Sequence, residues 1–221
     1  DRAHVRSRTV EVVNADDPVV NALPSRRRRV RFSMTSPADV TATDITWIGR
    51  GSMWTLTAGS ERATVMLPML GAFNVGNALA AAAAAWALGL RIGVIAERLS
   101  VVPQVPGRLE VLLDLPKVLR DYAHTPDALN RALSAVRPFA RGRLIVVFGC
   151  GGDRDRGKRR QMGAIAETKA DIVILTSDNP RTEDPEFILD DIEAGMHGKN
   201  HERIEDHRAA ISRAMAISRP G

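Results

Sequence analysis

One stretch of the chain, residues 144–185, alternates between strand-like and helix-like patterns and constrains the fold more than any other. Its two short apolar runs, Leu144–Phe148 and Ile172–Thr176, have the length and composition of buried strands. The segment Lys158–Thr168 between them can form a helix. Strand, helix and strand make a βαβ unit with parallel strands and a right-handed crossover. The sequence therefore predicts a parallel sheet with helices on its faces in this part of the chain.

A polar loop follows each of these two strands. Ligands of open parallel sheets bind beyond the carboxyl ends of the strands, and neighbouring strands lie about 5 Å apart, so both loops can reach one small ligand. The first loop contributes Arg154, and the second contributes Asp178, Asn179, Pro180 and Arg181. Arginine binds carboxylates bidentately and aspartate binds an ammonium, so the set suits a small zwitterion with more than one carboxylate. The alternative is an Asx turn capped by a surface arginine.

A domain boundary is predicted at residues 101–107, which contain two prolines and a glycine. The predicted domains are 1–105 and 106–221. After the boundary, a strand near Glu110–Leu113 precedes a helix that Thr125 caps and Pro126 begins. Two further helices, 185–196 and 206–217, complete a β-α-β-α-β-α order. This order predicts that Asp121 leaves the sheet at the same edge as the two polar loops.

The first half of the chain has a different pattern. Residues 40–67 alternate between polar and apolar types and predict a small antiparallel meander, with further strands at 9–13 and 30–32. An alanine-rich helix, about 78–88, is apolar on all sides and is expected to be buried. Asn74 and Asn77 stand at its predicted N-terminus, where one can cap the helix and leave the other for a ligand.

Composition narrows the class of protein. The 221 residues are 44% hydrophobic and carry a net charge of +5, so a folded core is expected rather than disorder. No apolar run is long enough to cross a bilayer, the first residues lack an apolar core, and there is one cysteine, which together predict a cytoplasmic protein without membrane insertion. Arg26–Arg29 and Arg31 form a basic cluster without interleaved aromatics, which favours a solvated loop over a nucleic-acid site.

The segment Gly152–Arg159 has nearly the spacing of a nucleotide-binding P-loop. It follows a strand, precedes a helix and contains Gly-Lys after four intervening residues. However, Arg159 stands where a serine or threonine would hold magnesium, and Asp153 and Asp155 would face the phosphates. The sequence therefore disfavours a P-loop here.

Six motifs in order along the chain resemble the Mur ligase family. They are Asn14–Pro18 (NADDP), Gly71–Ala80 (GAFNVGNALA), Pro106–Glu110 (PGRLE), Asp121–Leu129 (DYAHTPDAL), Phe148–Arg159 (FGCGGDRDRGKR) and Ser177–Pro185 (SDNPRTEDP). Within that family they are most similar to the members that add meso-diaminopimelate. The resemblance implies a mixed α/β fold, with the C-terminal half of the family's central ATP-binding domain at 1–105. The family's C-terminal Rossmann-like domain would occupy 106–221.

The resemblance also implies an activity. Mur ligases use ATP and Mg²⁺ to convert a carboxylate into an acyl phosphate, which an incoming amine attacks. The expected small-molecule partners of this chain are ATP, meso-diaminopimelate and the UDP-MurNAc-dipeptide. The protein is expected to be a monomer and to bind no nucleic acid. The nucleotide would contact Asn74, Asn77, Arg108, Asp121 and His124. Meso-diaminopimelate would contact Arg154, Asp178, Asn179, Pro180 and Arg181.

The family's P-loop and magnesium ligands are expected upstream of Asp1, so the chain is predicted to be a fragment without ligase activity of its own. No catalytic or metal-binding residue is assigned within it. Two alternatives stay open at this level: a related ligase that adds lysine, which Arg181 argues against, and a non-catalytic module that binds a nucleotide or a dicarboxylic amino acid.

Overall fold

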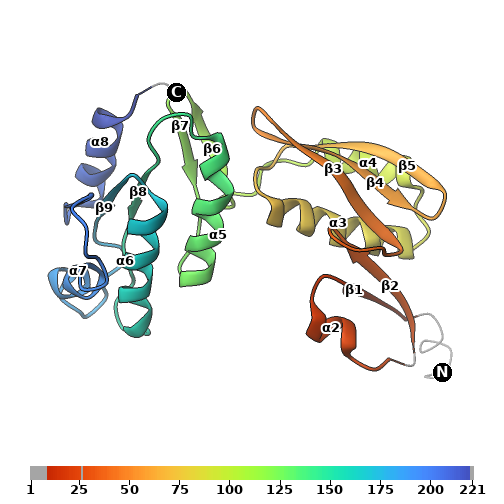
Figure 1. Cartoon of the computed structure of the whole chain (residues 1–221), viewed down its shortest axis with the longest axis horizontal. Coiled ribbons are helices and arrows are strands. Elements are labelled where there is room, and N and C mark those ends of the chain that lie inside the picture. The colour runs from red at the N-terminus through yellow and green to blue at the C-terminus, as the bar shows by residue number, and fades with distance from the viewer. Residues whose placement is uncertain (1–8, 26, 220–221) are drawn as a thin grey trace. The chain divides into compact units, whose positions relative to one another are not determined.

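The computed structural model describes residues 9–25 and 27–219; Arg26 of the basic cluster lies outside this part. The chain divides into two compact units, Asp1–Val105 and Pro106–Gly221 (Figure 1). Each has its own apolar core, so each is described by itself.

Unit 1 (Asp1–Val105) is built on a five-stranded sheet in the order β1-β2-β3-β4-β5. Its strands are β1 (Val10–Asn14), β2 (Arg28–Ser33), β3 (Val40–Ile48), β4 (Gly51–Ala58) and β5 (Glu61–Leu67). The predicted antiparallel meander is confirmed, because β3 pairs with β4 and β4 with β5 in antiparallel register. It continues into β2 and β1, which run parallel, so the whole sheet is mixed. The short helix α2 (Pro18–Ala22), capped by Asp17, connects β1 to β2.

Helices α3 (Ala72–Ala87) and α4 (Ile92–Ser100) supply the rest of the core of unit 1. Leu79 of α3 and Ile92 of α4 pack with Trp54 and Leu56 of β4, all almost completely buried. Two predictions were wrong here. The helix begins at residue 72 rather than 78, because Gly71, at φ +93°, turns the chain into it. It is also not buried all round: Ala81 and Ala84 are exposed, since a helix on one face of a sheet buries only its facing side.

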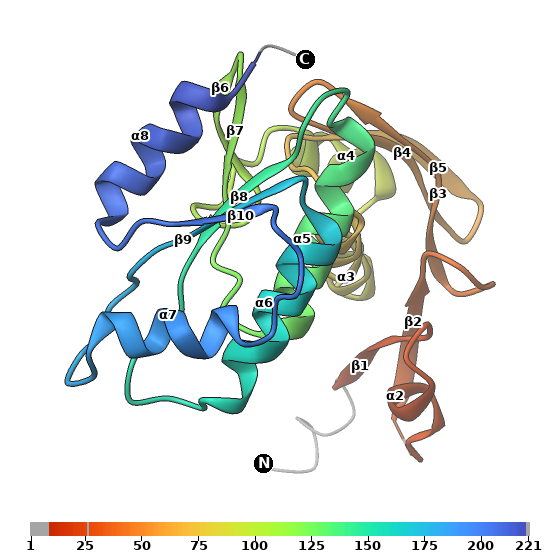
Figure 2. The ribbon, with the colours of Figure 1, turned by 60° about the vertical axis from the view of Figure 1, so that its left-hand side comes forward.

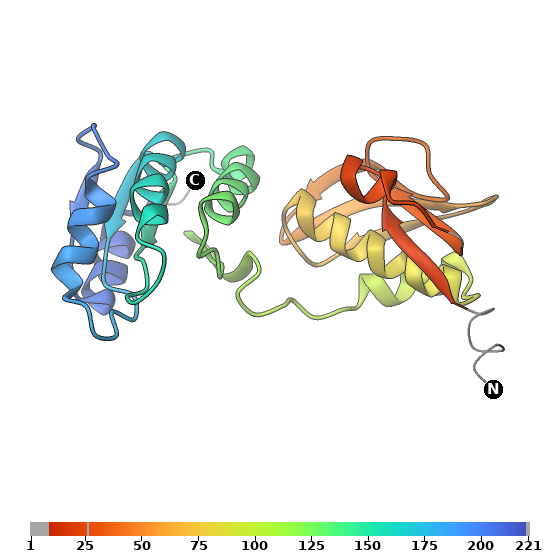
Figure 3. The ribbon, with the colours of Figure 1, turned by 90° about the horizontal axis from the view of Figure 1, so that it is seen from below.

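Unit 2 (Pro106–Gly221) contains a three-stranded parallel sheet in the order β10-β9-β8. The predicted βαβ unit is confirmed as β8 (Ile145–Phe148), α6 (Gly157–Lys169) and β9 (Ile172–Leu175), with Ile145 opposite Ile172. The remaining elements of this part are α5 (Pro126–Val136), a 3₁₀ turn at Arg137–Phe139, α7 (Pro185–Glu193), β10 (His201–Arg203) and α8 (His207–Ile217). Helices α6 and α8 lie on opposite sides of the sheet (Figures 2 and 3).

The strand predicted near Glu110 does not join this sheet. Strands β6 (Glu110–Asp114) and β7 (Lys117–Arg120) pair antiparallel with each other as a separate hairpin. Only Leu115 and Pro116 separate them, whereas a parallel neighbour needs a crossover of a dozen or more residues. The predicted β-α-β-α-β-α order was therefore wrong at its first strand, and Asp121 does not leave from the edge of the parallel sheet.

Within the described residues, none of the helices combines the length and the apolar character that crossing a membrane requires.

Candidate functional site

The polar loops after β8 and β9 are in direct contact. Loop 1 comprises residues 149–156 and loop 2 comprises residues 176–184. The Gly152 N–H donates to the carbonyl of Asn179 at 3.1 Å. A Cβ added to Gly149 would lie 2.1 Å from the oxygen of Thr176, and one added to Gly152 would lie 1.8 Å from that of Pro180. Only glycine fits at either position, so these residue types permit the close approach of the loops.

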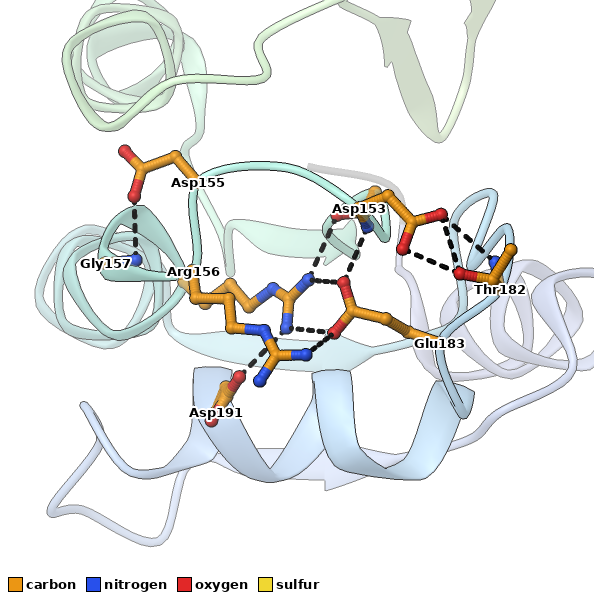
Figure 4. A network of polar contacts seen from close by, with 9 residues as sticks. Asp153, Asp155, Arg156, Gly157, Thr182, Glu183 and Asp191 are labelled. Atoms are coloured by element: carbon orange, nitrogen blue, oxygen red, sulfur yellow. Dashed lines mark hydrogen bonds and ion pairs between the residues drawn. The ribbon is translucent and has the colours of Figure 1, made fainter.

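Side-chain hydrogen bonds join the same two loops (Figure 4). The Asp153 carboxylate accepts the Thr182 hydroxyl at 2.8 Å through Oδ1 and the Thr182 N–H at 3.3 Å through Oδ2. In return, the Asp153 N–H donates to Glu183 Oε1 at 2.6 Å. Each loop therefore satisfies polar groups of the other, which stabilises their register.

Arg159, in the first turn of α6, lies beneath this junction with 0% of its side chain exposed. Its Nη1 and Nη2 donate to Oε2 and Oε1 of Glu183 at 3.0 and 2.8 Å, and Nη1 also donates to Asp191 Oδ2 at 2.9 Å. A further bond of 3.4 Å links Nη2 to the carbonyl of Gly151. One buried cation thus connects loop 1, loop 2 and α7.

Electrostatics at this junction favour the ionised carboxylate. The hydrogen bonds from Arg159, then that from the Asp153 N–H, lower the pKa of Glu183 from 4.5 to about 2. The nearby charge of Arg156, whose Nη2 lies 2.9 Å from Glu183 Oε2, acts in the same direction. Within loop 1, burial raises the pKa of the Cys150 thiol to about 11, and Cys150 is 3% exposed.

This geometry does not fit the P-loop that the spacing of Gly152–Arg159 resembles. Asp155 Oδ1 accepts the Gly157 N–H at 2.8 Å at the start of α6, and Glu183 occupies the Asp153 N–H. Arg159, in place of the magnesium-binding hydroxyl, is held by two carboxylates. Protein groups therefore take the donors that phosphates would need.

The residues predicted to bind an amino acid lie around the junction. Arg154 follows Asp153 in loop 1, and Arg181 precedes Thr182 in loop 2. Both arginines are exposed, and neither guanidinium forms an ion pair with another described residue. Asp178 and Asn179 are also exposed, next to the half-buried Pro180. The structure thus brings together the two loops that carry these residues, and it leaves both arginines available to a ligand.

The backbone of both loops is unusual. Asp153, Asn179 and Arg181 have φ values of 52°, 48° and 55°, in the left-handed region that residues with a side chain rarely adopt. Such conformations cluster at ligand-binding sites and persist where the surrounding structure enforces them.

A third segment approaches loop 1 from the hairpin side. Lys158 Nζ donates to the carbonyl of His124 at 2.9 Å, so residues 121–125 lie beside the start of α6 although β7 is outside the sheet. The His124 ring is exposed, 3.0 Å from the Tyr122 carbonyl through Nδ1 and 5.1 Å between ring centroids from Tyr122.

Asp121 itself holds the turn that carries Arg108. Its Oδ2 accepts the N–H of Leu109 at 2.9 Å, and the Tyr122 N–H donates to the carbonyl of Gly107 at 2.8 Å. Leu109 has φ +46°, so Asp121 stabilises a strained turn beneath the exposed Arg108. This contact occupies one carboxylate oxygen of Asp121.

Asn74 and Asn77 belong to α3 of unit 1, whereas the other predicted nucleotide residues belong to unit 2. Neither asparagine caps the helix, because Gly71 is at the N-cap and makes no side-chain bond. Asn74 is 3% exposed and its Nδ2 donates to the Leu70 carbonyl at 2.8 Å. Asn77 is exposed.

Sequence reasoning missed the residues that join the loops: Arg159, Thr182 and Glu183. It also missed a third loop, which follows β10. Glu205 accepts the N–H of Ser177 and the hydroxyl of Thr176 through its carbonyl, both at 3.0 Å. The only sequence signal for any of these was Arg159, as the residue that breaks the P-loop pattern.

Among the described residues, no three His, Cys, Asp or Glu side chains are grouped so that they could hold a metal ion.

Two family models match the chain. The Mur ligase middle domain matches residues 3–85, and the Mur ligase, glutamate ligase domain matches residues 107–221, more than half of the chain.

Named relatives and a solved structure agree with this match. UDP-N-acetylmuramoyl-L-alanyl-D-glutamate--2,6-diaminopimelate ligase of Synechococcus sp. (strain WH7803) is 46% identical over 220 residues, covering 95% of this chain and 44% of the relative. The ligase of the same name from Gloeobacter violaceus is 46% identical over 215 residues, with the same coverage. A solved structure of a ligase with that name has a TM-score of 0.68 and 35% identity, covering 100% of this chain and 48% of the other. The chain thus spans less than half the length of these relatives.

Proposed function

Because this chain belongs to the Mur ligase family, we propose that it forms part of an ATP-dependent ligase that adds meso-diaminopimelate to UDP-MurNAc-L-Ala-D-Glu. In this reaction an acyl phosphate forms on a carboxylate of the dipeptide substrate and the amine of diaminopimelate displaces the phosphate. The names of the relatives support this substrate.

One observation carries the proposal: loops 1 and 2 are hydrogen-bonded together, and each carries an exposed arginine without an ion-pair partner among the described residues. Arg154 and Arg181 are the carboxylate-binding groups of this site, and Asp178 is the ammonium-binding group. Meso-diaminopimelate differs from lysine by one distal carboxylate, and Arg181 selects for it. A polar site that requires such a group discriminates against an analogue without it by up to roughly 10⁴-fold.

The proposal extends to the nucleotide. Asn74 and Asn77 would contact the adenine, and Arg108 and Asp121 the ribose and phosphates, with His124 nearby. Mg²⁺ and positively charged groups would neutralise the phosphoryl oxygens during transfer. The exposure of Arg108 and Asn77 supports these assignments, whereas the burial of Asn74 leaves little of its side chain accessible to a ligand.

Ligand binding to the 221-residue chain tests the amino-acid site. Calorimetry should show that Arg181→Met weakens meso-diaminopimelate binding by about 10- to 100-fold, since a hydrogen-bonded charge contributes about 1.5–3 kcal/mol. Binding of L-lysine should hardly change. Arg131→Met, which removes an exposed arginine paired with Asp127 on α5, is the matched control and should leave both affinities unaltered. A chain that binds lysine as tightly as meso-diaminopimelate supports the lysine-adding alternative instead.

We also propose that the chain alone forms no amide bond, because a Gly-x-x-x-x-Gly-Lys-Ser/Thr motif occurs nowhere in its 221 residues. We further propose that the protein is cytoplasmic and monomeric. Its single cysteine suits a reducing compartment. Amide formation from ATP, UDP-MurNAc-dipeptide and meso-diaminopimelate by the isolated chain would contradict the proposed lack of activity. Sedimentation as a dimer would contradict the proposed monomeric state.

A further inference from the structure

The carboxylate of Glu183 gathers donors from several segments at once. It accepts hydrogen bonds from both terminal nitrogens of Arg159 and from the backbone N–H of Asp153. It also forms an ion pair with Arg156. Its side chain is 11% exposed and that of Arg159 is 0% exposed. Breaking such a buried pair leaves an uncompensated charge, so the contact is strongly maintained.

The contacts of Glu183 lie close to both proposed ligand groups along the chain. Asp153, which Glu183 holds, is followed directly by Arg154. Glu183 itself lies two residues after Arg181, and Thr182 between them is bonded to Asp153. The contacts of Glu183 therefore link the backbone next to Arg154 with the backbone next to Arg181.

The pair also explains how the loops keep their strained backbone. Each left-handed residue with a side chain costs of order 1–3 kcal/mol unless its surroundings enforce the conformation. Asp153 and Arg181 are two such residues, and each is within two positions of a bond to Glu183 or of Glu183 itself. The pair therefore contributes to holding these conformations, together with the Asp153–Thr182 bonds.

We infer that Arg159 and Glu183 are positioning residues for the diaminopimelate site. They contact no substrate atom; they hold loops 1 and 2 in the register that directs Arg154 and Arg181 to one ligand. The inference rests on the proposed function for the identity of the ligand, but the loop-holding role is independent of it.

Glu183→Gln in the 221-residue chain tests the inference, because it removes the charge and keeps the shape. Glu202→Gln is the matched control: Glu202 forms a similar two-bond pair with Arg213, at 2.7 and 2.8 Å, between β10 and α8. Three quantities are measured: the calorimetric Kd for meso-diaminopimelate, amide hydrogen exchange of peptides covering loops 1 and 2, and the thermal midpoint.

Glu183→Gln should weaken binding by about tenfold or more, since small misplacements of binding groups have large effects. Both loops should exchange faster together, while Glu202→Gln leaves loops and affinity unchanged. Unchanged loop exchange in Glu183→Gln, or an equal effect of the two variants, overturns the inference. If the wild-type chain binds no meso-diaminopimelate, the proposed function fails. Amide hydrogen exchange alone then tests the loop-holding role: faster exchange of both loops in Glu183→Gln supports it, and unchanged exchange refutes it.

Discussion

Asp153 and Thr182 bond through both groups that Thr182 can donate, its N–H and its hydroxyl, across two loops that are 29 residues apart in sequence. This contact explains how exposed loops stay in register after the sheet has ended.

Replacement of Asp153 by alanine should destabilise unit 2 by about 2–4 kcal/mol. The variant loses the hydrogen bonds to Thr182, each of which contributes about 1 kcal/mol. It also places alanine at φ 52°, where aspartate is better tolerated. Urea unfolding measures the loss. Thr182→Val, which removes the hydroxyl and keeps the N–H, should cost only about 1 kcal/mol, and a larger cost than that of Asp153→Ala contradicts this account.

Replacement of Gly152 by alanine should be far more harmful than replacement of its neighbour. Its new Cβ would lie 1.8 Å from the Pro180 oxygen, so the loops must separate. We expect a loss of about 1–3 kcal/mol in the free energy of unfolding together with weaker meso-diaminopimelate binding. Gly151→Ala is the control, since its nearest atom is 3.9 Å away. Similar unfolding midpoints for both variants would show that the loop contact is not tight.

Stability should depend on pH through Glu183. Its pKa is lowered in the folded protein to about 2 from 4.5, so the folded state favours the ionised form. The resulting stabilisation is present above pH 4.5 and is lost as pH falls towards 2. Unfolding free energies of wild type and Glu183→Gln should therefore converge on acidification through this range. A difference that stays constant from pH 6 to the acid limit of folding contradicts the assigned ionisation.

The N-terminal cap of α5 should contribute measurably to the stability of unit 2, in the segment that lies beside loop 1. Thr125 Oγ1 accepts the N–H of Ala128 at 3.2 Å, directly after His124. Thr125→Ala should lower stability by about 1 kcal/mol, whereas Thr125→Ser should retain most of it. Thermal unfolding measured for both variants distinguishes loss of the hydroxyl from loss of the methyl group, because only the former affects the cap.

Local and regular patterns in the sequence predicted much of this architecture. The apolar runs of β8 and β9 with a helix between them identified the βαβ unit, and Thr125 with Pro126 marked the start of α5. The alternation over residues 40–67 identified the meander. In each case the information lies within about 30 residues, where periodicity and capping act.

The remaining features depend on distant partners. Strand β10 has the sequence His-Glu-Arg, which carries no apolar pattern, and it is a strand because β9 pairs with it. Arg159 can be buried because the carboxylates of Glu183 and Asp191, 24 and 32 residues away in sequence, neutralise its charge and accept its hydrogen bonds. The sequence predicted a ligand-binding role for Arg154 and Arg181, which are exposed, but it did not reveal the residues that hold their loops. A candidate ligand-binding side chain can be recognised from its residue type, whereas a contact between residues distant in sequence cannot.

The burial of Cys150 provides an internal reporter on loop 1. Its thiol is almost fully protonated at neutral pH and is shielded from solvent, so alkylating reagents should modify the folded protein very slowly. Modification then requires local opening, and its rate counts the openings of the segment that leads into Gly151 and Gly152. Since the chain has one cysteine, a single mass increment on the intact protein records that motion without any engineered label.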